Sequence, residues 1–136
     1  MDRTEMLMKE LEGFLDAAYE AVSELDALVR AELGGDSNPI GRVQTGFAQR
    51  AVLAIREAGE ELRPTSRLAT QPSRRIGRVA ELLAIAADAV AQLNAKLCLL
   101  RGRGEDGGQS NSARIALAAL RMAGRKLDLL AENLGA

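Results

Sequence analysis

The chain has 136 residues, of which 47% are apolar and 27% are charged, and its net charge is −1. This composition is typical of a single globular domain and argues against global disorder. The chain contains no histidine and one cysteine, so catalytic pairs or metal sites that need histidine, and an internal disulfide, are excluded.

The sequence also bears on localisation. Residues 1–5 do not begin a signal peptide, and Glu81, Asp88 and Lys96 interrupt the most apolar segment. We therefore expect no membrane span and no membrane partner. With a single cysteine, the chain suits a reducing compartment, and we predict a cytoplasmic protein.

Residues 4–33 carry small or apolar side chains at alternating spacings of four and three, which predicts a long helix with one apolar face. This seam consists of Thr4, Met8, Leu11, Leu15, Ala18, Val22, Leu25 and Val29. Four flanking side chains widen it: Leu7, Phe14, Ala21 and Leu28. The width favours a helical bundle over a two-stranded coiled coil.

A second helix is predicted over residues 39–62. Asp36, Ser37 and Asn38 offer capping oxygens, and Pro39 suits a first helical position. Its apolar face is the least regular of the chain, and Pro64 stops it.

A third helix is predicted over residues 73–101, with Ser73 as its cap. Its seam is Ile76, Val79, Leu83, Ala86, Val90, Leu93, Leu97 and Leu100. A ridge of small residues runs beside the seam: Ala80, Ala84, Ala87, Ala91 and Ala95. A helix that is apolar around most of its circumference is usually covered on more than one side. Either this helix is central in the bundle, or the alanine ridge is an interface for a second copy or a protein partner.

Glycines make residues 102–111 a predicted flexible connector, and a fourth helix follows over residues 112–134. Its seam is Ala116, Leu120, Ala123, Leu127, Leu130 and Leu134. Four predicted helices, three of them with 3.5-residue apolar periods, predict one all-α domain, an antiparallel up-down-up-down four-helix bundle with coiled-coil-like packing.

Charge is distributed unevenly along the chain. Residues 1–36 hold ten acidic and three basic side chains, whereas the remaining hundred hold nine acidic and fifteen basic ones. Five arginines surround the start of the third helix: Arg63, Arg67, Arg74, Arg75 and Arg78. They are candidate contacts for anions or nucleic acid. The other interpretation is that they balance the acidic first helix, which the absence of aromatic residues beside them favours.

Motifs for catalysis are absent from the sequence. Glu57 and Glu60 form a Glu-x-x-Glu pair, but no Glu-x-x-Asp completes a magnesium site. Cys98 lies on an apolar helix, which indicates a buried thiol. We expect no enzyme activity, no metal and no cofactor.

Residues 86–97, followed by a short connector, resemble the third helix of small bacterial four-helix-bundle proteins. These are the ribosomal-RNA intervening-sequence proteins and the accessory proteins of diversity-generating retroelements. Residues 123–127 also resemble the second group. The resemblance implies a bacterial-type bundle, and the retroelement proteins are typically basic oligomers that bind nucleic acid and a reverse transcriptase. The acidic first helix and the scarcity of aromatics depart from that pattern.

From the residues, we predict a non-enzymatic interaction protein that self-associates or docks on a protein partner through the third helix. The alternative is a nucleic-acid-associated accessory bundle that binds phosphates through the arginines between residues 63 and 78.

Overall fold

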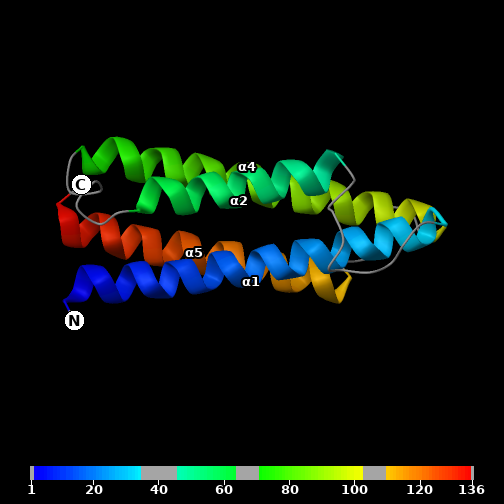
Figure 1. Cartoon of the computed structure of the whole chain (residues 1–136), viewed down its shortest axis with the longest axis horizontal. Helices are drawn as coiled ribbons and strands as arrows, with labels where there is room; N and C mark the ends of the chain where they lie inside the picture. The colour runs from blue at the N-terminus through cyan, green and yellow to red at the C-terminus, as the bar shows by residue number, and fades with distance from the viewer. Residues whose placement is uncertain (1, 35–45, 64–70, 103–109, 136) are drawn as a thin grey trace.

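The computed structural model describes residues 2–34, 46–63, 71–102 and 110–135. They form four helices: α1 (Arg3–Glu32), α2 (Gly46–Leu62), α4 (Pro72–Leu100) and α5 (Asn111–Leu134). Successive helices run in opposite directions, so the predicted up-down-up-down bundle is confirmed (Figure 1). α1 lies along α5, α2 lies along α4, and α4 contacts all three other helices.

The predicted seams form the core of the bundle. The α1 seam is buried from Met8 to Val29, the α4 seam from Val79 to Leu97 and the α5 seam from Ala116 to Leu130. Because a 3.5-residue period keeps these side chains on one face, four such faces enclose a core of Leu, Val, Ile and Ala. Leu100 departs from the prediction, because its side chain is 37% exposed at the end of α4.

The exposure of Leu100 follows from unequal helix lengths. At 1.5 Å per residue, α1 and α4 are each about 44 Å long, whereas α2 is about 26 Å long. The C-terminal ends of α1 and α4 therefore project together beyond the first turns of α2 and α5 (Figure 1). Glu32 and Arg101 join the two projecting ends through an ion pair of 3.0 Å.

The structure moves two predicted helix starts by one residue each. α4 begins at Pro72 rather than after a Ser73 cap, since the fixed φ of proline suits a first helical turn. The preceding Gln71 has φ 56° and no capping side chain. α5 begins at Asn111, because the Ser110 hydroxyl oxygen accepts a hydrogen bond from the Ala113 N–H at 3.2 Å.

The other described helix ends lie within one residue of their predicted positions. The predicted start of the second helix at Pro39, and residues 103–109 of the predicted connector, lie outside the described residues.

The hydropathy of α4 corrects another expectation. Contrary to the prediction from Glu81, Asp88 and Lys96, α4 contains a window of mean hydropathy 1.5, so by length and composition it is apolar enough to cross a membrane. Half of that window is buried inside the bundle. A core helix has the same composition, so the finding carries no membrane assignment.

Candidate functional site

The alanine ridge of α4 lies at the surface of the bundle. Ala80, Ala84 and Ala91 are exposed, whereas Ala87 and Ala95 are half-buried. Ala87 also packs against the core. α4 thus contacts every other helix and also has a strip of small side chains at the surface. The sequence alone did not show that both features occur in the same helix.

Exposed Glu81 and Asp88 lie next to the ridge around α4, and larger apolar side chains lie beyond them, toward α2. On α4, Ile85 is 40% exposed and Leu99 is 65% exposed, and on the neighbouring α2 Leu53 is 52% exposed. Leu53 and Ile85 line a shallow groove of about 370 Å³ between α2 and α4, with Arg50 and Glu57 at its rim. The outer side of α4 therefore combines a strip of small side chains with Glu81 and Asp88, which separate that strip from the apolar groove toward α2.

The described arginines of the predicted cluster are largely engaged by carboxylates. Arg63 Nε lies 2.9 Å from Glu12 Oε1 of α1, and Arg75 Nη1 lies 3.5 Å from Glu61 Oε2 of α2. Arg67 lies outside the described residues. The arginines that the sequence grouped by position are therefore distributed over contacts with two other helices.

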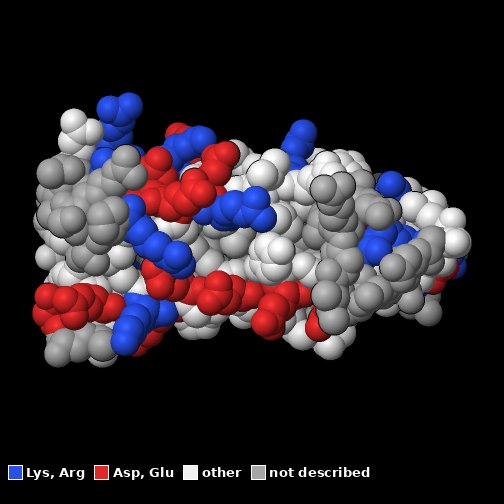
Figure 2. All heavy atoms as spheres, viewed as in Figure 1, with Lys and Arg blue, Asp and Glu red and all other residues white. Residues whose placement is uncertain are grey.

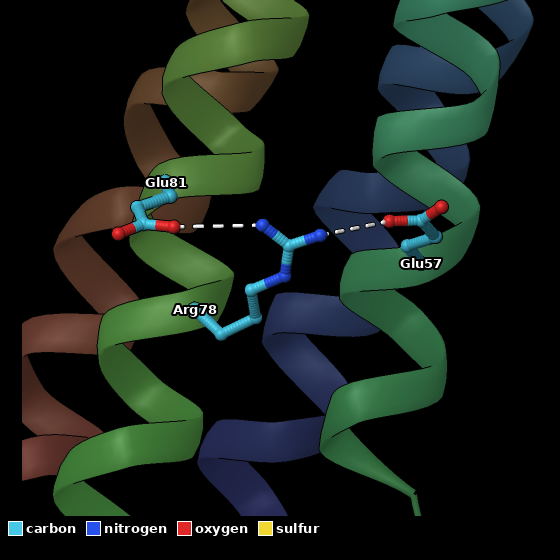
Figure 3. A network of polar contacts seen from close by, with 3 residues as sticks. All are labelled: Glu57, Arg78 and Glu81. Carbon is cyan, nitrogen blue, oxygen red and sulfur yellow. Dashed lines mark hydrogen bonds and ion pairs between the residues drawn. The ribbon is translucent and has the colours of Figure 1, made fainter.

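Arg78 bridges two helices in the same way. Its guanidinium lies 3.3 Å from Glu57 of α2 and 3.5 Å from Glu81 of α4, between the two carboxylates (Figure 3). All three side chains are about half exposed or more, so each ion pair contributes on the order of 0.2–1 kcal/mol. The contacts nearly neutralise the local charge, which weakens attraction for a phosphate.

A recess of about 400 Å³ remains at the N-terminus of α4. Its lining consists of Glu61, Gln71, Arg74, Arg75 and Arg78. Arg74 is exposed, and among the described residues no ion pair to it is observed. Within the predicted arginine cluster, Arg74 in this recess is therefore the described side chain that is available to bind an anion.

Glu57 of the Glu-x-x-Glu pair and the nearby Glu61 serve as partners of arginine. Glu57 pairs with Arg78, and Glu61 pairs with Arg75. Among the residues that the structure describes, no group of three acidic, cysteine or histidine side chains is arranged to hold a metal ion.

The interior holds polar contacts on α4 that position α5. The side-chain oxygen of Asn94, which is 8% exposed, accepts a hydrogen bond from the Ser110 N–H at 3.0 Å. Its amide nitrogen lies 3.9 Å from Cys98 Sγ, and Cys98 is buried, as its apolar surroundings in sequence indicate. Asn94 thereby ties α4 to the N-cap of α5, a role consistent with a register-setting polar residue.

Sequence reasoning missed a buried ion pair on α1. Asp26 Oδ2 lies 2.9 Å from Arg30 Nε, and their side chains are 0% and 6% exposed. The i,i+4 spacing of opposite charges is a visible signal, but both residues lie off the heptad seam, where the pattern predicts a polar face.

Comparison with known proteins gives no assignment: no family model, curated protein or solved structure matches the chain.

Proposed function

We propose that the protein is a non-enzymatic interaction module that docks a helix of a second copy or of a protein partner along the outer side of α4. The observation that supports this proposal is the exposure of Ala80, Ala84 and Ala91 on one helix face. Small side chains allow two helix axes to approach closely, because interaxial distance depends on the side chains at the contact.

The first test introduces charge into the alanine ridge. Ala84→Glu with Ala91→Glu is preferred to a change at Ala87, because Ala87 packs against the core and its replacement would destabilise the bundle itself. Both chosen alanines are exposed, so the helical circular dichroism of the variant should match that of the wild type. Ala31→Glu, at an exposed alanine on α1, is the matched control.

Association is measured by light scattering over a range of protein concentrations and by recovery of bound protein from the native source. The proposal expects the double variant, but not the control, to lose either a self-association step or a bound protein. If wild type and double variant behave alike in both measurements, the outer side of α4 is not a docking surface.

Nucleic-acid binding through the arginine cluster has less support from the contacts, because Arg63, Arg75 and Arg78 already face carboxylates. Its specific observation is Arg74 in the recess at the start of α4. Since Tyr19 is the only tyrosine and tryptophan is absent, bound nucleic acid would dominate absorbance at 260 nm. Salt-sensitive excess absorbance that disappears in Arg74→Glu would favour this second function.

A further inference from the structure

The face formed by α1 and α5 carries an unusual charge arrangement. Lys9 and Asp16 lie seven residues apart on α1 and Glu20 follows four later, so the three side chains fall within about 40° around the helix. On α5, Arg114, Arg121 and Asp128 are also seven residues apart and fall within about 40°. All six residues are exposed. Within the described part of the chain, none of them forms an ion pair.

Contacts between α1 and α5 fix the positions of the two rows along the bundle axis. We call this position the height of a residue. Glu10 pairs with Lys126 at 2.6 Å, and Glu24 accepts a hydrogen bond from Ser112 at 3.5 Å. Thr4 and Asn133 are hydrogen-bonded near the other end. In each pair the two residue numbers add up to about 136. Lys9 is therefore nearly level with Asp128, Asp16 with Arg121, and Glu20 lies about half a turn from Arg114.

Among these six residues, those at equal height thus have opposite charge, but they lie on separate edges of the same face. The acidic edge follows α1, where Figure 2 shows carboxylates in a row along the lower part of the molecule. Lys9 is the basic member of the otherwise acidic row on α1, and it is level with Asp128, the acidic member of the row on α5. A side chain at one edge needs a second molecule to reach its counterpart.

The strip between the two edges contains several small or apolar side chains, but it also holds the Glu10–Lys126 ion pair and the exposed side chains of Glu24 and Arg125. Gly13 and Ala118 are exposed and Ala17 is half-buried. Toward the ends of the strip, Met6 is 43% exposed and Ile115 is 44% exposed. By height, Gly13 is level with the half-buried Met122, and Ala17 with Ala118, so close approach of another copy is sterically open.

We propose that the α1–α5 face binds a second copy of this chain, around a two-fold axis parallel to the helices. That rotation keeps every residue at its own height and places α1 of one protomer on α5 of its partner. Asp16 then faces the partner's Arg121, Lys9 faces the partner's Asp128, and Glu20 approaches the partner's Arg114. A two-fold axis across the helices would instead set α1 on α1 and oppose like charges.

The dimensions suit a stable dimer. Two helices side by side are about 20 Å wide, and α5 is about 36 Å long, so the face covers about 700 Å². A typical specific interface uses about 800 Å² on each partner. The proposal is independent of docking on α4, since a dimer of this kind leaves the outer side of both α4 helices uncovered.

Symmetry provides a test with two charge reversals. Asp16→Arg sets a new arginine against the partner's Arg121 at both symmetric contacts of its own dimer, and Arg121→Asp sets a new aspartate against the partner's Asp16 at both. Each variant alone should dimerise at least about tenfold more weakly than the wild type, because like charges are opposed across the interface. In an equimolar mixture of the two, a heterodimer has one contact between the two introduced side chains and one between the two native ones. Both contacts then pair opposite charges, and heterodimers should form.

The measurement is sedimentation equilibrium of wild type, each variant and the mixture, with circular dichroism to confirm helical folding. Asp88→Arg, a reversal at an exposed site on α4, is the matched control and should leave the dimer unchanged. A monomeric wild type, a dimer that tolerates both reversals, or two weakened variants that do not combine would each overturn the proposal. Ala84→Glu with Ala91→Glu should not affect this dimer, so failure of the α4 proposal is recognised separately.

Discussion

At the scale of single residues, the Asp26–Arg30 ion pair places two opposite charges inside the bundle. The two side chains are almost fully buried and 2.9 Å apart, so each is the counter-charge of the other. Transfer of charged groups out of water is expensive, and an uncompensated partner is worse than an apolar pair. The pair therefore constrains which side chain can be changed alone.

Asp26→Asn should lower the free energy of unfolding by about 3 kcal/mol, because it removes the carboxylate that lies 2.9 Å from the buried Arg30 guanidinium. Replacing both residues by leucine should recover most of that loss. Urea unfolding followed by far-ultraviolet circular dichroism measures both. Asp88→Asn, at an exposed site on α4 outside the proposed dimer face, is the control and should change stability by less than about 0.5 kcal/mol. Equal effects of Asp26→Asn and the control would contradict this account.

At the scale of elements, glycines inside and beyond the helices have different roles. Gly59 lies within α2, and a Cβ atom added there would meet no atom within 4 Å. Gly135 follows α5 with φ 70°, a left-handed conformation that caps the helix. Gly59 thus lowers the stability of α2 through its poor helix propensity, whereas Gly135 is required by the positive φ of the backbone.

Gly59→Ala should raise the free energy of unfolding by about 0.5–1 kcal/mol, because alanine loses less backbone entropy in a helix. Gly135→Ala should lower it by about 1 kcal/mol, because a Cβ atom is strained at positive φ. Thermal melts of both variants give the two signs. Changes of the same sign would show that the local backbone does not govern these positions.

At the scale of the whole molecule, we propose separate roles for two surfaces. The α1–α5 face is proposed to bind a second copy through its charged rows, and the outer side of α4 is proposed to dock a helix along its strip of small residues. A dimer through the first face would present two α4 surfaces, so that one assembly offers two docking sites. Bivalent presentation raises avidity without any new contact.

The proposed dimer contains one unfavourable pair at its end, where Glu5 faces Glu132 of the partner subunit. Glu132→Lys should lower the dimer dissociation constant several-fold by making this pair attractive, and Glu132→Gln should have an intermediate effect. Sedimentation equilibrium at low salt checks the order. In a Glu5→Gln background the gain should largely vanish, and a gain of full size there would place Glu132 against some other group.

The helices and their buried faces were determined by the sequence itself. A 3.5-residue apolar period is a local property, and in an α-helix it places the apolar side chains on one face. Leu11, Val90 and Leu127 are buried for that reason. Tertiary structure decided what each remaining face meets. In the sequence, the arginines from Arg63 to Arg78 form one cluster. In the structure, carboxylates of α1 and α2 lie beside Arg63, Arg75 and Arg78.

Likewise, the match between Asp16 and Arg121 depends on the register of α1 against α5. That register is set by core packing and by contacts such as Glu10–Lys126, which join residues more than a hundred positions apart. Helical periodicity carries no information about such distances along the chain. It specifies which side chains share a face, whereas only the packed bundle specifies their height and their neighbours.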